Sequence, residues 1–154
     1  MTSAYSVIGI MGPNSRALLE EVSDECLSNE LFPFGTSREF EIGYTRVRAS
    51  RITYVGELGW ELYIPTEFSR HVYDRILSVM PDLAHAGFHA MNSLRLEKGY
   101  RHWGHDITDE ETPLEAGLSF AVAWDKPGGF IGQEALLAQR ESGVERRLVQ
   151  FALE

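Results

Sequence analysis

The stretch Tyr54–Pro65 reads YVGELGWELYIP and joins a glycine-marked turn to the start of an apolar strand. Glu57 lies in the Gly-Glu-Leu-Gly turn, where a carboxylate can reach water. Glu61 lies between Trp60 and Leu62, where burying an ionised side chain is costly. A charge at this position therefore needs an explanation.

Two interpretations of Glu61 fit the local pattern. In the first, Glu61 is an edge-strand residue whose carboxylate reaches solvent. In the second, Glu61 is a ligand-binding carboxylate in a pocket walled by Tyr54, Trp60 and Tyr63. A carboxylate accepts two hydrogen bonds side by side, so it suits a flat heterocycle with an amino group beside a ring N–H. Aromatic walls would contact the faces of such a ring.

The segments on either side of this stretch alternate between strand and helix patterns. Apolar runs and turn residues predict strands over residues 4–10, 39–44, 46–55, 60–64, 117–124 and 147–153. Helical spacing and breakers predict helices over residues 16–22, 66–80, 87–98 and 133–140. Thr66 is a suitable N-cap, and Gly99 a suitable C-cap. This order predicts an α+β fold with a mainly antiparallel sheet and packed helices.

Composition narrows the class of protein. The chain has 154 residues, 44% of them hydrophobic and 24% charged, as in an ordinary globular domain. The net charge of −9 disfavours nucleic acid as a partner. No apolar run is long enough to span a membrane, and the N-terminus is a poor signal peptide. The single cysteine, Cys26, excludes an internal disulfide and fits a reducing compartment, so we expect a cytoplasmic protein, or a mitochondrial matrix protein in a eukaryote.

Basic residues gather in two places despite the acidic composition. Arg46, Arg48 and Arg51 occur in one strand-like segment, and such a patch can bind a small anionic ligand. A second group lies in and after the helix predicted over residues 87–98. There Arg95 follows Met91 by four residues on the apolar side, so a buried ion pair or a ligand contact is open to it.

The sequence offers little for metal binding or nucleophilic catalysis. His102 and His105 are three apart in a loop, and His85 and His89 are four apart on a helix, without the glutamate of a His-Glu-x-x-His motif. Structural or solvated histidines explain these pairs, with hydrogen bonds from the loop pair to Asp106 or Asp109. A Gly-x-Ser-x-Gly motif is absent, and Cys26 has no histidine near it in sequence. We therefore assign no catalytic residue and no metal ligand.

Four blocks carry a resemblance to a known family. They read YVGELGWELYIP, AGFHAMNSLRLEKGYRHWGHDI, TPLEAGL and DKPGGFIGQEAL, and together with GIMGPNSRALLE they cover nearly the whole chain. In this order they resemble the aminomethyltransferase family, the T-protein of the glycine cleavage system. The amino-acid sequences of these blocks are most similar to those of the C-terminal folate domains of dimethylglycine and sarcosine dehydrogenases and oxidases.

The resemblance implies a function and a set of site residues. It implies a tetrahydrofolate-binding portion of a one-carbon transferase that forms 5,10-methylenetetrahydrofolate from an N-methyl amine or aminomethyl donor. Glu61 matches the family glutamate that holds the pterin edge, and Tyr54 matches an aromatic folate contact. Arg95 matches a recurring helix arginine and is a weaker candidate, while Glu57 matches a turn glutamate of structural role. FAD would belong only to a separate flavin oxidoreductase domain of the longer relatives.

The chain departs from the family pattern at one side chain, in a missing aspartate and in a C-terminal β-barrel reduced to its first strand. Met91 stands where the family often has a folate-contacting arginine, and methionine cannot replace that charge. The family's catalytic aspartate precedes the GPNSRALLE block, and nothing in this chain matches it. We therefore expect a middle piece of a longer fold. Residues 1–140 would form a partial folate-binding domain, and residues 141–154 would supply the first strand of a truncated C-terminal β-barrel.

These departures leave open whether the chain is an enzyme. One alternative is a non-catalytic folate-binding module, as in relatives linked to iron–sulfur cluster maintenance. Those relatives carry a Lys-Gly-Cys-Tyr-Thr-Gly-Gln-Glu block that this chain lacks. Another alternative is an inactive fragment that binds no ligand.

Overall fold

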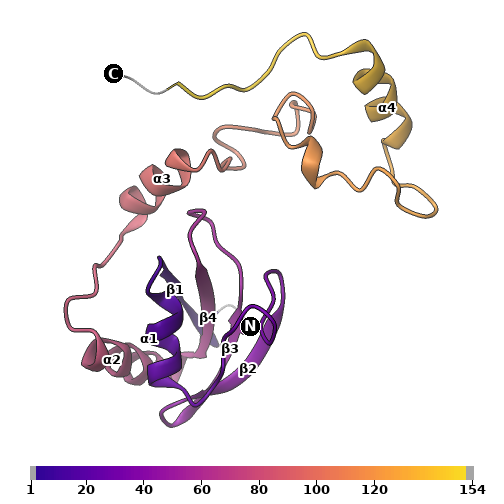
Figure 1. Ribbon diagram of the computed structural model, residues 1–154. Helices are drawn as coiled ribbons and strands as arrows, with labels where there is room; N and C mark the ends of the chain where they lie inside the picture. Colours follow the sequence, from indigo (N-terminus) through magenta and orange to yellow (C-terminus); the bar gives the residue numbers. More distant parts are fainter. Residues whose placement is uncertain (1–2, 152–154) are drawn as a thin grey trace. The chain divides into compact units, whose positions relative to one another are not determined.

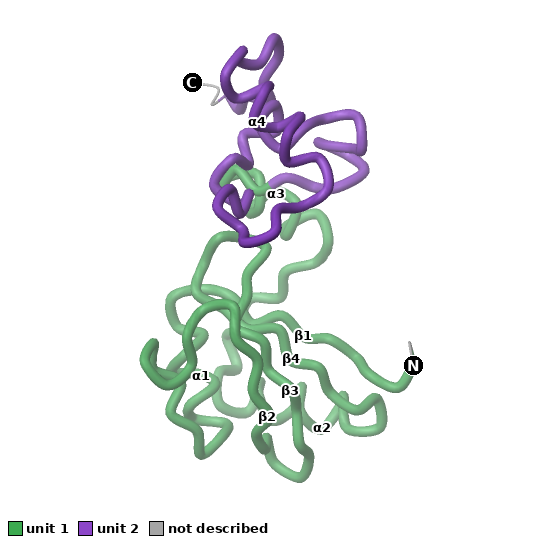
Figure 2. Tube along the Cα trace, turned by 90° about the vertical axis from the view of Figure 1, so that its right-hand side faces the viewer, with its two compact units in different colours: residues 1–100 green, residues 101–154 purple. Residues whose placement is uncertain are grey.

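The computed structural model describes residues 3–151 and shows an α+β protein. The chain divides into two compact units, residues 1–100 and residues 101–154 (Figure 2). The first unit holds one antiparallel sheet and most of the helical residues, so the α+β class predicted from sequence is confirmed. No helix among the described residues is long and apolar enough to cross a membrane.

Four strands form the sheet of the first unit in the order β1-β4-β3-β2 (Figure 1). Their bounds are β1 Tyr5–Met11, β2 Ser37–Ile42, β3 Thr45–Ser50 and β4 Gly59–Pro65, and all neighbours are antiparallel. Gly43 and Tyr44 connect β2 to β3, and Gly43 has φ +60°, as the first central residue of a tight primed hairpin turn requires. The third strand ends at Ser50, five residues before the predicted end, because the Ile52 amide bonds back to the Ser50 carbonyl.

Two helices cover one face of this sheet, α1 (Ser15–Val22) and α2 (Ser69–Val79) (Figure 1). The one-turn 3₁₀ helix η1 (Thr66–Phe68) leads into α2. Thr66 is its first residue and not, as was predicted, its N-cap, because the Thr66 hydroxyl donates to the Ser3 carbonyl instead of accepting from the helix. The apolar face predicted for this helix is confirmed. Val72 and Ile76 are buried, and Phe68 and Val79 pack against the same core.

The helix α3 (Phe88–Glu97) completes the first unit and ends as its sequence predicts. The Tyr100 amide bonds to the Arg95 carbonyl, and the Gly99 amide bonds to the Leu96 carbonyl. Gly99 has φ +69°, so this is a Schellman C-cap. The predicted apolar side is not a packed face, since Phe88 is 65% and Leu94 39% exposed while Arg95 is buried.

The second unit contains α4 (Gln133–Ser142), the short 3₁₀ helix η2 (Ser119–Ala121) and a series of turns. The strand predicted over residues 117–124 is wrong. Gly117 has φ +68°, and the Trp124 indole donates to the Ser119 carbonyl at 3.0 Å, which folds the segment back on itself. The closing strand predicted over residues 147–153 is not formed at residues 147–151, and residues 152–153 lie outside the described part. The domain boundary placed at residue 140 stays a prediction.

Candidate functional site

Glu61 lies on the face of the sheet opposite the helices. Successive residues of a strand point to opposite faces, and β4 follows this rule strictly. Trp60, Leu62 and Ile64 are 0% exposed in the core, whereas Glu61 and Tyr63 are half-buried on the outer face. The prediction that Trp60 walls a pocket around Glu61 is therefore wrong, because the indole packs among the core residues and contacts the Phe32 ring edge-on.

Small residues flank Glu61 across the sheet. Its register partners are Gly9 on β1 and Ser50 on β3, and Ser50 in turn pairs with Ser37 on β2. The Ser50 hydroxyl donates to the Ser37 hydroxyl at 3.1 Å, which keeps both short side chains close to the sheet. The carboxylate thus stands in a row of residues that carry little bulk.

Tyr63 holds the Glu61 carboxylate in place. The Tyr63 hydroxyl donates to Glu61 Oε2 at 2.8 Å, and both side chains lie on the outer face, two residues apart on β4. This hydrogen bond, together with the negative charge beside it, raises the pKa of the Tyr63 phenol above 10.0. Tyr63 therefore stays a neutral donor. Glu61 Oε1 and the remaining lone pairs of Oε2 can accept further hydrogen bonds from a ligand.

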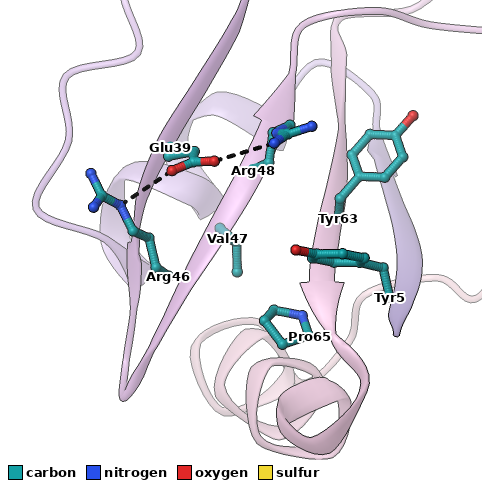
Figure 3. A pocket seen from close by; sticks show the side chains of 7 residues that line it. All are labelled: Tyr5, Glu39, Arg46, Val47, Arg48, Tyr63 and Pro65. Atoms are coloured by element: carbon teal, nitrogen blue, oxygen red, sulfur yellow. Dashed lines mark hydrogen bonds and ion pairs between the residues drawn. The ribbon is translucent and has the colours of Figure 1, made fainter. Parts of the chain in front are cut away.

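A cavity of about 360 Å³ adjoins this pair on the outer face (Figure 3). Arg46 and Arg48 project from β3 on either side of Glu39, with N–O distances of 3.6 Å and 3.4 Å to its carboxylate. The Tyr5 ring extends from β1 toward β3 (Figure 3). The residues lining the cavity come from all four strands and are Tyr5, Glu39, Arg46, Val47, Arg48, Tyr63 and Pro65. The sequence grouped Arg46 and Arg48, but it did not predict their place beside Tyr63.

The third arginine of that group has a different environment. Arg51 follows the end of β3 and donates to the Phe32 carbonyl at 2.6 Å and to Asn29 Oδ1 at 2.8 Å. Its guanidinium lies over the Trp60 ring, 5.6 Å from the centroid. Arg51 therefore binds the loop before β2, and the predicted basic cluster is split between two places.

Glu57, to which the family resemblance gave a structural role, has an ion-pair partner in the same unit. Its carboxylate forms an ion pair with Lys98 Nζ at 2.9 Å. That hydrogen bond raises the pKa of Lys98, so the lysine keeps its charge at neutral pH. Gly56 has φ +72°, and a Cβ there would lie 2.5 Å from Lys98 Cγ, so the turn and the end of α3 approach closely.

Arg95 is buried at 1% exposure and holds the end of its own helix. Its guanidinium donates to Asn92 Oδ1 at 2.6 and 2.8 Å and to the Tyr100 carbonyl at 3.0 Å. These hydrogen bonds give Arg95, on α3, a helix-stabilising role, whereas Glu61 lies on the sheet.

The other two positions that the family resemblance singled out are half-buried. Tyr54 lies in the loop before β4, and Met91 lies one helical turn before Arg95.

The histidines form local hydrogen bonds. His105 Nδ1 lies 3.0 Å from Asp106 Oδ1, and the His102 amide donates to Asp106 Oδ2 at 2.9 Å, which confirms the bonding expected in this loop. His85 Nε2 lies 2.8 Å from the Tyr73 hydroxyl. Among residues 3–151, no three His, Cys, Asp or Glu side chains are grouped so that they could hold a metal ion. Cys26 is exposed.

Comparison with known proteins identifies the family. Residues 1–126 match the family described as "GCVT N-terminal domain", which is most of the chain. This chain belongs to the GCVT N-terminal domain family. The aminomethyltransferase-like character expected from the sequence blocks is thereby confirmed.

Relatives of this GCVT domain include enzymes of two sizes. Human mitochondrial sarcosine dehydrogenase is 47% identical over 150 residues, which cover 96% of this chain and 16% of that protein. The aminomethyltransferase of Halothermothrix orenii is 41% identical over 154 residues, covering 97% of this chain and 42% of that protein. The chain thus spans well under half the length of these relatives.

A solved structure has the same fold as this GCVT domain. The crystal structure of glycine cleavage system aminomethyltransferase T from Bartonella henselae matches with a TM-score of 0.71 and 30% sequence identity. The match covers 90% of this chain and 37% of the other. The chain therefore has the fold of part of a T-protein, as predicted.

Proposed function

We propose that this chain binds tetrahydrofolate as part of a one-carbon transferase, with Glu61 accepting hydrogen bonds from the amino-pyrimidinone edge of the pterin. One observation carries the proposal. The Glu61 carboxylate stands on the open face of the sheet between Gly9 and Ser50, held by the Tyr63 hydroxyl at 2.8 Å. Membership of an aminomethyltransferase-like family supports folate as the ligand.

The donor and acceptor inventory of the site fits a pterin edge. The exocyclic amine and the adjacent ring N–H present two parallel donors, which a carboxylate accepts as a pair. Tyr63 uses only part of the capacity of one oxygen. A neutral tyrosine donor at this position also orients the carboxylate before the ligand arrives, which lowers the ordering cost of binding.

Tyr54 and Arg95 have different roles in the proposed site, one direct and one indirect. Tyr54 would contact a face of the pterin or the aminobenzoyl ring from the loop before β4. Arg95 would act through the position of α3, since its guanidinium bonds to Asn92 and Tyr100. No residue of the chain is assigned to proton transfer.

We propose that the chain contributes to the reaction by positioning the folate. In the whole enzyme, N5 of the bound folate would attack the carbon of a one-carbon iminium, and N10 would then displace the amine, which leaves with the two protons lost by N5 and N10. Glu61 would fix the pterin so that both nitrogens face the carbon. Correct orientation of two reactants alone can supply a large part of a rate enhancement. The oxidation of an N-methyl amine would take place in a separate flavin oxidoreductase domain, which makes that domain the proposed partner.

Calorimetric titration of the full chain with tetrahydrofolate tests the site. We expect wild-type binding, and a loss of at least tenfold in affinity for Glu61→Gln, because one charge-assisted hydrogen-bond pair contributes about 1.5–3 kcal/mol. Glu57→Gln is the matched control, since its carboxylate pairs with Lys98. Equal effects of the two substitutions would remove the role assigned to Glu61.

A second measurement distinguishes a transferase from a binding module. A flavin oxidoreductase that oxidises an N-methyl amine is added with tetrahydrofolate, and formation of 5,10-methylenetetrahydrofolate is followed with and without the chain. Faster formation with the wild-type chain than with Glu61→Gln supports transfer. Folate binding without any acceleration would leave a non-catalytic module as the function.

A further inference from the structure

We propose that a cavity in the second unit binds the C-terminal residue of a partner's peptide chain, with Arg140 and Arg147 contacting its carboxylate. The cavity has a volume of about 410 Å³, in the range of small-ligand sites, and is lined from η2 and from the end of α4. All of its lining residues belong to the second unit, whereas Glu61 belongs to the first. Peptide binding there does not depend on folate binding at Glu61.

Two arginines give the cavity its charge. Arg140 and Arg147 line it, and neither of them forms an ion pair within the part of the chain that the structure describes. Arg140 is held in place, because its guanidinium lies 4.9 Å from the centroid of the Trp124 ring. The Trp124 indole is itself fixed by donating to the Ser119 carbonyl at 3.0 Å. Arginine forms paired hydrogen bonds with carboxylates, so these two side chains favour a ligand that carries one.

The acidic residues nearest in sequence do not enter the cavity. The Glu115 carboxylate accepts from the Thr112 amide at 2.8 Å and lies 3.2 Å from Arg146 Nε. Glu141 and Glu145 are exposed to solvent, which screens their charges, and they lie outside the lining. A ligand in the cavity therefore contacts basic groups and no carboxylate among the described residues.

The cavity also offers hydrogen-bond acceptors. Its lining includes Gln139, whose side-chain oxygen is buried and has no hydrogen-bond partner among the described residues. Gln139 and Arg140 belong to the last turn of α4, and Gly143 is its C-cap, so backbone carbonyls with partial negative charge are close. A ligand that carries only a carboxylate has no donor for these oxygens. The last residue of a peptide chain carries a carboxylate and a backbone N–H together, so it suits both the arginines and the acceptors.

Apolar side chains complete the lining and select the kind of last residue. Leu114 and Val144 are half-buried, and the Phe120 ring is 84% exposed. Contact with an apolar side chain of the ligand would remove this surface from water, which favours binding. We therefore expect a peptide that ends in an apolar residue such as leucine.

NMR titration of the full chain with three probes tests the proposal. The probes are acetyl-Gly-Gly-Ala-Leu with a free carboxylate, the same peptide as its C-terminal amide, and isocaproate, which is leucine without its amino group. We expect the free-carboxylate peptide to shift the amide resonances of Gly117 and Gly143, which line the cavity. The C-terminal amide lacks the charge and isocaproate lacks the N–H, so each should bind about tenfold more weakly or worse.

Three variants locate the binding. Arg147→Gln should bind the free-carboxylate peptide about as weakly as the wild type binds the amide, and should fold normally because Arg147 is exposed. Lys126→Gln is the matched control, since it removes the same charge from an exposed residue of the second unit outside the lining. Glu61→Gln should bind the peptide as the wild type does, which separates the cavity from the proposed folate site.

Several results would overturn the inference while leaving the proposed function standing. Equal affinity for the free-carboxylate peptide and its amide would remove the role of the arginines, and so would equal losses in Arg147→Gln and Lys126→Gln. Isocaproate binding as tightly as the peptide would assign the cavity to carboxylic acids in general and overturn the peptide as its occupant. Absence of shifts with all three probes would overturn the site itself.

Discussion

At residue 61 the chain places a charge between two side chains that have no exposed surface, Trp60 and Leu62. The structure shows how this is possible without a buried ion. The strand turns Glu61 to the outer face, where Tyr63 donates to it and its neighbours across the sheet are the small residues Gly9 and Ser50. The desolvation cost is thus small, and the carboxylate stays available as an acceptor.

The first prediction concerns the Tyr63 phenol. Its raised pKa comes chiefly from the hydrogen bond to Glu61, because ionising the phenol would break that bond and place two negative charges together. Glu61→Ala should lower the pKa of Tyr63 toward 10.0, and Glu61→Gln should lower it less, since an amide oxygen still accepts the bond. NMR titration of ring-labelled tyrosine measures this value. An unchanged pKa in Glu61→Ala would show that the pair is not formed in solution.

The places of some of these residues could be predicted from the sequence, and those of others could not. Glu61 stood out because its neighbours are apolar. The prediction that Trp60 walls the pocket around Glu61 was wrong because adjacent residues of a strand face opposite sides of the sheet. The approach of Arg48 to Tyr63 depends on which residues of β3 and β4 are opposite each other. That register follows from the whole sheet, and no local pattern contains it.

Among the elements, β1 and β4 make an unusually close pair at one end. A Cβ on Gly59 would clash with Met11 Sδ and lie 2.8 Å from the Ile10 carbonyl oxygen. Glycine at this position therefore permits the register in which Gly9 faces Glu61.

The second prediction follows from that approach. Gly59→Ala should reduce the free energy of unfolding by about 1–3 kcal/mol, because backbone atoms must shift to make room. Gly9→Ala is the control, since a Cβ there meets Met11 Cε at an ordinary 3.5 Å. Urea unfolding of both variants measures the difference. Equal stability of the two would contradict the proposed cause.

In the second unit, two Thr-x-x-Glu segments form turns in which the glutamate carboxylate accepts from the threonine amide. Glu111 accepts from the Thr108 amide at 2.8 Å, and Glu115 accepts from the Thr112 amide at 2.8 Å. Arg146 Nε lies 3.2 Å from Glu115 Oε1. These hydrogen bonds lower the pKa of both carboxyls below 4.5, with the Thr108 hydroxyl the largest cause at Glu111 and the Thr112 amide at Glu115.

The third prediction is the pH dependence of these turns. A carboxyl whose pKa is lower in the folded state stabilises it above pH 4.5, and this contribution is lost as the pH falls through the folded pKa. The amide resonances of Thr108 and Thr112 should therefore titrate with midpoints below 4.5. Glu115→Gln should abolish the titration at Thr112 and keep it at Thr108. Midpoints at or above 4.5 would contradict the hydrogen bonding described.

Local patterns predicted the helices and the four strands of the first unit but failed for residues 117–124. That segment has alternating apolar residues, yet its backbone forms short-range bonds, such as the Ala121 amide to the Leu118 carbonyl. A strand needs a neighbouring strand to accept its hydrogen bonds, and periodicity carries no information about whether one is present.

For the molecule as a whole, burial is uneven between the two units. The core cluster, which includes Leu19, Phe40, Trp60 and Leu62, lies in the first unit. Among the described residues of the second unit, the buried apolar side chains are Ile107 and Ala116. The apolar stabilisation of the chain therefore resides chiefly in residues 1–100.

The fourth prediction compares a substitution in each unit. Leu62→Ala should cost about 2–5 kcal/mol of unfolding free energy, because it leaves a cavity in the core. Leu137→Ala in α4, where the side chain is 40% exposed, should change it by about 0.5 kcal/mol or less. Urea unfolding followed through the amide resonances of the sheet measures both. Similar costs would contradict the uneven distribution of burial.

The alternation along β4 has a consequence for how this family diversifies. Odd-numbered positions 61 and 63 meet the open face, and even-numbered positions 60, 62 and 64 determine the packing of the sheet. Substitutions at 61 and 63 can change what is bound without loss of the fold, because these side chains lie outside the core. Relatives with the same ligand should therefore keep both residues, and relatives with another ligand should differ at 61 and 63 before they differ at 60, 62 or 64.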